Sequence, residues 1–146
     1  SQAHSSIAMA ISGMWKRKLG VEVELQHVEW EAFLNARGRQ DFEMARGAWC
    51  GDYNEASTFL DLFVSASGYN DGKYANAKVD ELMQASKTMM NPSQAYAQVE
   101  IIMTEDMPVI PIYHYSAVFL LNPKIKNWPF QNVEQIWYSK DLYKIQ

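Results

Sequence analysis

The segment from Arg46 to Glu55 contains the residue types that could recognise a charged, extended ligand. It reads Arg-Gly-Ala-Trp-Cys-Gly-Asp-Tyr-Asn-Glu. A carboxylate such as Asp52 can pair with an ammonium group, and an arginine such as Arg46 can bind a carboxylate through two parallel hydrogen bonds. The backbone near Ala48 and Cys50 can pair with another extended chain without reading its side chains. These groups complement an extended peptide, although a structural ion pair between Arg46 and Asp52 would use the same charges.

Cysteine chemistry and metal binding find little support in the sequence. Cys50 is the only cysteine, and nothing in the spacing brings His4, His27 or His114 to it as a base. A hydrolase that uses Cys50 is therefore a minor alternative. No His or Cys pair has metal-ligand spacing on a helix, and the glycines form neither common phosphate-binding loop. We expect no catalytic residue, no metal site and no cofactor.

The composition is that of a globular protein with no preference for nucleic acid. Of 146 residues, 48% are hydrophobic and 21% charged, which allows one domain with a buried core. The net charge is −4 and no basic run exceeds Lys16–Lys18, whereas a phosphate backbone needs a basic face. No apolar stretch reaches the roughly 18 residues that cross a bilayer. Because the start lacks a secretion signal, we expect the chain to begin inside a domain or to be cut from a longer precursor.

The spacing of apolar residues predicts the elements that position the segment from Arg46 to Glu55. The predicted order is helix 5–19, strand 21–27, helix 30–37 and strand 42–49. A strand, a helix and a strand in succession form a βαβ unit, whose two strands are parallel neighbours. Ligands of open α/β sheets bind beyond the carboxyl ends of such strands, where residues 46–52 follow. The charged and aromatic segment therefore lies where a binding site is expected.

The rest of the chain is predicted to be helical and then extended. The predicted order is helix 58–64, loop 65–72, helices 77–90 and 93–106, extended chain 107–115 and strand 118–121. Prolines exclude helix from residues 107–115. The apolar stripe of the first long helix consists of Val79, Leu82, Met83 and Met90. Asn91 or Ser93 is a suitable N-cap for the second long helix.

The string Trp49-Cys-Gly-Asp-Tyr-Asn-Glu55 resembles the Trp-Cys-Ala-Asp-Tyr-Asn-Glu-Pro motif of OppA-type oligopeptide-binding proteins, which feed peptide ABC importers. The murein tripeptide-binding proteins are close relatives of that family. The similarity continues in register over nearly the whole chain, at Trp15–Val21, Glu29-Trp30, Phe33-Leu34, Arg37, Phe42, Val109–Tyr113 and Asp141–Tyr143.

The resemblance implies an α/β fold of the class II periplasmic-binding-protein type, with this chain as a fragment of the C-terminal lobe that contains the βαβ unit and flanking helices. Residues 1–116 are expected to form the later part of that lobe. Residues 117–146 are expected to form a return strand and a tail toward the N-terminal lobe. The peptide would be enclosed between the two lobes.

The function implied by the resemblance is binding of short oligopeptides in the periplasm, or at a lipid-anchored extracytoplasmic position, and delivery to an inner-membrane ABC permease without catalysis. A specialised murein-peptide or dipeptide binder on the same scaffold is the alternative. A structural role in the envelope without any ligand is a third possibility.

The resemblance also implies roles for individual residues. Asp52 corresponds to the carboxylate that meets the peptide's amino terminus, and Ala48 and Cys50 to positions that pair with its backbone. Arg46 corresponds to an arginine that receives the carboxyl terminus of a short peptide, and His4 to a histidine that reaches a longer one. Residues that line side-chain pockets or the cleft correspond to Trp30, Arg37, Trp49 and Tyr115.

Some positions depart from the family pattern. Ala48 replaces a usual glycine, Gly51 an alanine, and Ala56 the proline after Glu55. Cys50 corresponds to a family cysteine that forms a disulfide with an upstream residue, which this sequence does not contain. The departures leave the role of Asp52 intact and the preferred peptide length open.

Overall fold

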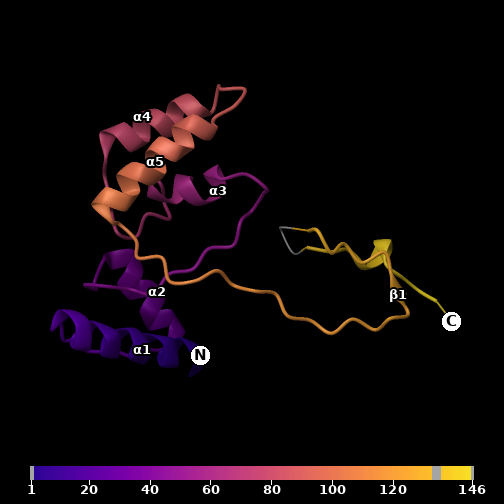
Figure 1. Ribbon diagram of the computed structural model, residues 1–146, viewed down its shortest axis with the longest axis horizontal. Coiled ribbons are helices and arrows are strands. Elements are labelled where there is room, and N and C mark those ends of the chain that lie inside the picture. Colours follow the sequence, from indigo (N-terminus) through magenta and orange to yellow (C-terminus); the bar gives the residue numbers. More distant parts are fainter. Residues whose placement is uncertain (1, 133–135, 146) are drawn as a thin grey trace. The chain divides into compact units, whose positions relative to one another are not determined.

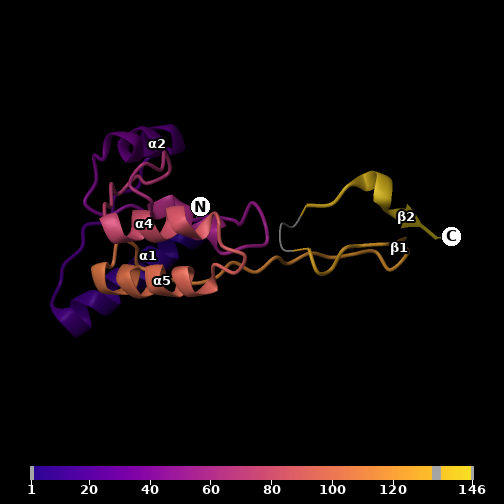
Figure 2. The same cartoon turned by 90° about the horizontal axis from the view of Figure 1, so that it is seen from above.

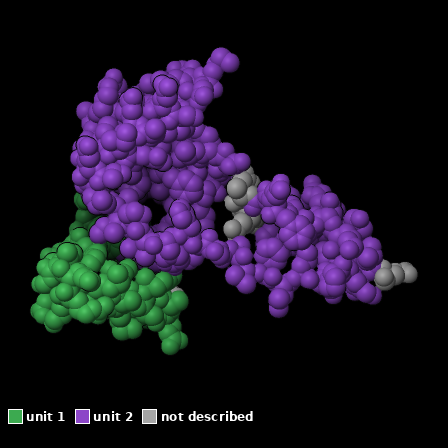
Figure 3. All heavy atoms as spheres, in the orientation of Figure 1, with its two compact units in different colours: residues 1–45 green, residues 46–146 purple. Residues whose placement is uncertain are grey.

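The computed structural model describes residues 2–132 and 136–145 of the chain. Figure 1 and Figure 2 show its elements in two views, coloured along the sequence. The chain forms two compact units, residues 1–45 and residues 46–146 (Figure 3). No helix in the described residues is long and apolar enough to span a membrane.

The first unit contains the helices α1 (Gln2–Leu19) and α2 (Trp30–Arg39). Helix α1 ends where predicted, because Gly20 adopts φ +69° and its N–H donates to the carbonyl of Lys16 at 3.2 Å. Helix α2 ends at Arg39, and its C-cap residue Gln40 is also left-handed, with φ 60° and ψ 32°. Both predicted helices are confirmed, and α1 begins earlier than its apolar stripe indicated.

The predicted strands 21–27 and 42–49 do not pair, so the predicted βαβ unit is not formed among the described residues. The one sheet in those residues joins other segments. The alternation that predicted the first strand does appear in the burial pattern, since Val23 and Leu25 are half-buried and Glu22 and Glu24 exposed. A strand also needs a neighbour for its ladder of hydrogen bonds, and the described chain supplies none.

The second unit contains a helical core. Its elements are α3 (Ser57–Leu60), the 3₁₀ turn η1 (Asp61–Phe63), α4 (Ala77–Ser86) and α5 (Ser93–Asp106). Helices α4 and α5 lie side by side in both views, and α3 packs against α5 (Figure 1, Figure 2). The buried cluster consists of Leu60, Val79, Met83 and Val99. The predicted stripe is thus confirmed at Val79, Leu82 and Met83, which pack in or against this cluster.

Met90 does not belong to the core and is fully exposed, which corrects the prediction. Helix α4 ends at Ser86 and not at residue 90. The hydroxyl of Thr88 donates to the carbonyl of Ala85 at 3.1 Å, which competes with continued helix. Pro92 then disfavours helical backbone in the residue before it.

Asparagine side chains accept hydrogen bonds from backbone N–H groups at the starts of α4 and α5. The side chain of Asn76 accepts hydrogen bonds from the N–H groups of Lys78 and Val79 at 3.0 and 3.4 Å. The side chain of Asn91 accepts from the N–H of Ser93 at 3.1 Å. The N-cap residue of α5 is Pro92, so the prediction of Asn91 or Ser93 at that position is wrong, although the Asn91 side chain does contact the first residue of the helix.

Residues 107–121 make no strand pairing, and the prediction of a strand at 118–121 is wrong for this structure. Val118 and Leu120 are 91% and 103% exposed. Further along, β1 (Ile125–Lys126) pairs antiparallel with β2 (Tyr143–Lys144), after the short 3₁₀ turn η2 (Ser139–Asp141). The rings of Phe119, Trp128 and Trp137 pack together, with centroid distances of 5.2 and 4.5 Å.

Candidate ligand-binding site beside Asp52

Asp52 lies in a turn that the start of α3 holds in place. Its N–H donates to the hydroxyl oxygen of Thr58 at 2.9 Å, and that hydroxyl lies 3.5 Å from a carboxylate oxygen of Asp52. Thr58 is buried, whereas the carboxylate of Asp52 is exposed. The core therefore fixes the backbone of Asp52 and leaves its charge available to a ligand.

Neighbouring residues complete this turn. A side chain at position 51 would place its Cβ 3.3 Å from the Thr58 methyl and 3.4 Å from the Phe59 ring, so the glycine lets the chain pass close to α3. The carboxylate of Glu55 accepts hydrogen bonds from the hydroxyl and the N–H of Ser57. Hydrogen bonds from Ser57, and then from Tyr96, lower the pKa of Glu55. Glu55 thus bonds to Ser57 at the start of α3, whereas Asp52 contacts Thr58 and also lines a neighbouring hollow.

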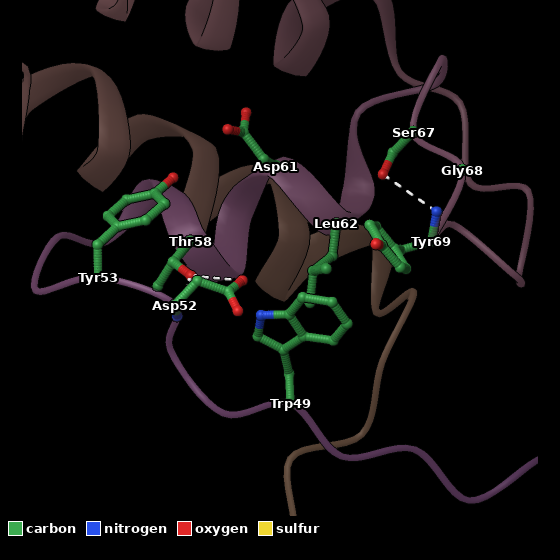
Figure 4. A pocket seen from close by; sticks show the side chains of 9 residues that line it. All are labelled: Trp49, Asp52, Tyr53, Thr58, Asp61, Leu62, Ser67, Gly68 and Tyr69. Carbon is green, nitrogen blue, oxygen red and sulfur yellow. Dashed lines mark hydrogen bonds between the residues drawn. The ribbon is translucent and has the colours of Figure 1, made fainter. Parts of the chain in front are cut away.

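A hollow of about 310 Å³ opens beside Asp52 (Figure 4). It is lined by Trp49, Asp52, Tyr53, Thr58, Asp61, Leu62, Ser67, Gly68 and Tyr69. The lining offers two carboxylates, aromatic faces and hydroxyl oxygens but no cationic side chain. Such a surface suits an ammonium group, which gains from carboxylate oxygens and from aromatic faces.

Trp49 forms the floor between Asp52 and the loop that carries Tyr69 (Figure 4). Its ring packs edge-on against that of Tyr69, with a centroid distance of 4.9 Å and an interplanar angle of 60°. Its indole nitrogen Nε1 is buried without a hydrogen-bond partner in the described residues. Buried polar groups are nearly always paired, so this nitrogen is an exception within the described residues.

Arg46 contacts Tyr115 across 69 positions of sequence, with Nη2 donating to the phenol oxygen at 2.5 Å. The rings of Tyr113 and Tyr115 pack at a centroid distance of 4.9 Å. A hydrogen bond from Tyr113, assisted by Arg46, lowers the pKa of Tyr115, and the same contact raises the pKa of Tyr113. No ion pair joins Arg46 to Asp52 in the described part of the chain. The alternative in which these two charges form a structural ion pair is therefore not observed.

The backbone between Arg46 and Asp52 is open. Ala48 and Cys50 are exposed, and none of their backbone groups has a hydrogen-bond partner among residues 2–132 and 136–145. Cys50 is a free thiol among those residues. An exposed, unpaired stretch of this kind can accept an added strand.

The remaining predicted site residues belong to residues 1–45. Trp30 and Arg37 are both on α2 and both contact Phe33. The Trp30 and Phe33 rings stack at 5.7 Å, and the Arg37 guanidinium lies 5.5 Å from the Phe33 ring centre. His4 is half-buried on α1.

Of the residues that line the hollow, only Trp49 and Asp52 were predicted as site residues, and three of the others have a definite part in it. Thr58 orients Asp52, Asp61 adds a second carboxylate, and Tyr69 packs on Trp49. Asp61 and Tyr69 lie in segments predicted only as apolar helix and loop. The bond of Thr58 to the backbone of Asp52 spans six positions, which is longer than the common local patterns of two to four, so the sequence carried no clear signal for it.

Comparisons with known proteins relate these features to a family. Residues 1–71 match the family described as bacterial extracellular solute-binding proteins, family 5 Middle. Over its whole length the chain is 38% identical to the periplasmic murein peptide-binding protein MppA of Escherichia coli, of which it covers 28%. Over 96% of its length it is 36% identical to the probable deoxycholate-binding periplasmic protein YgiS of the same species, of which it covers 27%.

Solved structures show the same relationship. All of this chain aligns with 29% of the Escherichia coli murein tripeptide-binding protein MppA, with a TM-score of 0.86 and 36% identity. The Haemophilus influenzae OppA complex with RPPGFSPFR gives a TM-score of 0.86 and 31% identity, over 99% of this chain and 29% of that one. The fold is therefore α/β and part of the class II periplasmic-binding-protein type.

The chain spans less than a third of the length of the relatives it matches. The agreement nevertheless extends from α1 to the last residues, and it includes the segment that carries Asp52. Residues 1–71 of this chain thus match the bacterial extracellular solute-binding proteins of family 5, and the whole chain is similar to OppA-type oligopeptide-binding and murein peptide-binding proteins.

Proposed function

We propose that this chain is part of an extracytoplasmic protein that binds short oligopeptides and delivers them to an inner-membrane ABC permease. It would act without catalysis, in the periplasm or anchored to a membrane by lipid. The observation that carries the proposal is the exposed carboxylate of Asp52, held by buried Thr58 at the edge of a hollow without cationic side chains. In this proposal Asp52 binds the amino terminus of the peptide.

The rest of the peptide would meet groups that ignore its sequence. The unpaired backbone at Ala48 and Cys50 would pair with the peptide backbone. Arg46, oriented by Tyr115, would receive the carboxyl terminus of a short peptide, and His4 that of a longer one. Trp30, Arg37 and Trp49 would line side-chain pockets.

The domain assignment is also a proposal. Residues 1–116 would form the later part of the C-terminal lobe, and residues 117–146 a return strand and tail toward the N-terminal lobe. The peptide would then be enclosed between two lobes, of which this chain provides part of one. Residues 1–146 alone should bind peptide weakly, and nanomolar affinity in this chain would contradict the two-lobe mechanism.

The test is the Asp52→Asn variant of the whole protein, measured by calorimetric titration with a tripeptide. Loss of a charge-assisted hydrogen bond should weaken binding by about 10- to 100-fold. Asp41→Asn, which makes the same change in charge at an exposed site on the first unit, is the control and should bind normally. An N-acetylated tripeptide should bind weakly to the unaltered protein and no more weakly to Asp52→Asn. Equal affinities of the two proteins for the free tripeptide would refute the role of Asp52.

One relative favours a different ligand class, since its name describes probable deoxycholate binding. Murein peptides and dipeptides are closer alternatives, and a Cys50-dependent hydrolase is a distant one. Native mass spectrometry of the purified whole protein would identify a co-purified ligand. The mass of that ligand would distinguish a bile acid such as deoxycholate from a peptide. Incubation with peptides, followed by a search for cleavage products, would test for the hydrolase.

A further inference from the structure

The loop between η1 and α4, residues 64–76, is closed by one buried side chain. Asn70 is 4% exposed. Its amide nitrogen donates to the carbonyls of Tyr74 at 2.7 Å and Val64 at 3.4 Å, and its amide oxygen accepts from the N–H of Tyr74 at 3.0 Å. These bonds use both the donor nitrogen and the acceptor oxygen of the amide, so Asn70 joins the two ends of the loop.

Both ends of this loop are also tied to the core helices. On one side the N–H of Ser65 donates to Asp80 of α4 at 2.8 Å. On the other side the Tyr74 phenol and the Asn76 amide both donate to Asp106 at the end of α5, at 2.5 and 2.9 Å. A loop fixed at its ends and its centre provides a rigid wall.

This wall closes the hollow on the side away from Asp52. Ser67, Gly68 and Tyr69 line it there, with Trp49 between them and Asp52 (Figure 4). Tyr69 is 67% exposed, so little of its ring is used for folding, yet the ring is held edge-on against Trp49. These adjacent residues therefore have different roles. Asn70 is buried and holds the loop, whereas Tyr69 is exposed and lines the hollow.

We propose that Tyr69 determines which first side chain the ligand carries, and that Asn70 is the positioning residue that holds Tyr69. This rests on the proposed function, in which the amino terminus of a peptide binds Asp52. The side chain of the first peptide residue then extends over Trp49 toward the ring of Tyr69. Aromatic rings meet apolar and aromatic groups favourably, so the wall selects peptides that begin with Phe or Leu over those that begin with Gly.

The experiment measures affinities of the whole protein for tripeptides that differ only in the first residue, Gly, Leu or Phe. Tyr69→Ala should weaken the binding of the Phe and Leu peptides by about 2- to 10-fold and leave the Gly peptide within twofold. Tyr69→Phe keeps the ring and should retain the original preference. An unchanged preference in Tyr69→Ala, or an equal loss for all three peptides, overturns the proposal.

The role of Asn70 is tested by the same ratio of affinities. Asn70→Ala should remove the preference for Phe over Gly while the Gly peptide still binds, although Tyr69 is present. Because loss of a buried amide can prevent folding, Tyr74→Phe is the milder second variant, and it should reduce the preference by loosening one end of the loop. A full preference in Asn70→Ala, or in Tyr74→Phe if Asn70→Ala does not fold, excludes the positioning role.

Asp52→Asn separates failure of this inference from failure of the proposed function. If Asp52→Asn weakens the binding of all three peptides and Tyr69→Ala changes no preference, only the role assigned to Tyr69 is wrong. If Asp52→Asn changes nothing, the amino terminus binds elsewhere and both assignments fall.

Discussion

Residues 57–106 bury several of their large apolar side chains, whereas the described residues of 107–146 bury none of theirs. In the first region Val79, Met83 and Val99 are buried almost completely between α3, α4 and α5. In the second region no described residue is buried, and Val118 and Leu120 are almost entirely exposed. Both regions are rich in apolar residues, so composition does not explain the contrast.

The contrast distinguishes contacts made within a short segment from contacts that require residues far away in the sequence. Helices α4 and α5 satisfy their own backbone hydrogen bonds and pair across a short connection. An extended segment such as residues 108–121 makes no strand pairing, and its exposed apolar side chains can be covered only by another part of a protein. Residues 57–106 therefore form a self-contained core, and we expect residues 107–146 to be stabilised by chain beyond this sequence.

The largest expected effect concerns the self-contained core. Met83→Ala should lower the free energy of unfolding by about 2–5 kcal/mol, because it leaves a cavity among Val79, Val99 and Leu60. Met90→Ala is the matched control, with the same substitution at a fully exposed position, and should change stability by less than about 0.5 kcal/mol. Urea denaturation of both variants gives the comparison. A similar loss in the two variants would show that Met90 is also covered.

A second prediction concerns the exposed region and uses one substitution in two contexts. Leu120→Ala should leave the stability of residues 1–146 unchanged, because the side chain is solvated there. In the whole protein it should cost about 1.5–3 kcal/mol, the value for a buried leucine, if residues 117–146 pack against the other lobe. Thermal and urea unfolding of the whole protein measure this. No loss in the whole protein would contradict the domain proposal.

The same division explains which structural features could be predicted from the sequence. Helices 93–106 and 5–19 were predictable because a helix depends on its own residues and on caps such as Gly20. The segment around Asp52 was identifiable because its residue types and its resemblance to a family both lie within a short string. The strands at 21–27 and 42–49 did not pair, because a strand depends on a neighbour that the pattern cannot specify. Tyr69 was missed because its role comes from the folding of a loop onto Trp49.

A third, smaller effect concerns the start of α4. Asn76→Ala should lower stability by about 1 kcal/mol, because the side chain caps the N–H groups of Lys78 and Val79. Ser93→Ala at the start of α5 is the control. It should lower stability by only a few tenths of a kcal/mol, since the Ser93 side chain makes no cap hydrogen bond. Urea denaturation distinguishes the two. Equal losses would mean that the cap of α4 is not used.

The smallest expected effect is pH-dependent and concerns the bond between Tyr74 and Asp106. The hydrogen bonds from Tyr74 and Asn76 lower the pKa of Asp106 below its usual 3.8, so this stabilisation exists above that pH and is lost as pH falls through the lowered pKa. Burial, assisted by the nearby Asp106, raises the pKa of Tyr74 to about 12. Its contribution exists below pH 10, where the unfolded phenol is neutral, and is lost as pH rises toward 12.

Tyr74→Phe removes this bond and should therefore reduce stability most between about pH 5 and pH 9, with the deficit shrinking toward both extremes. The deficit should be small, because the bond is exposed to solvent. Tyr143→Phe in β2 is the control, since its ring is exposed and the same hydroxyl is removed. Urea denaturation across the pH range measures the difference between the variants. A deficit independent of pH would mean that Tyr74 stabilises the loop by packing alone, and that the acid on α5 does not hold the wall of the hollow in place.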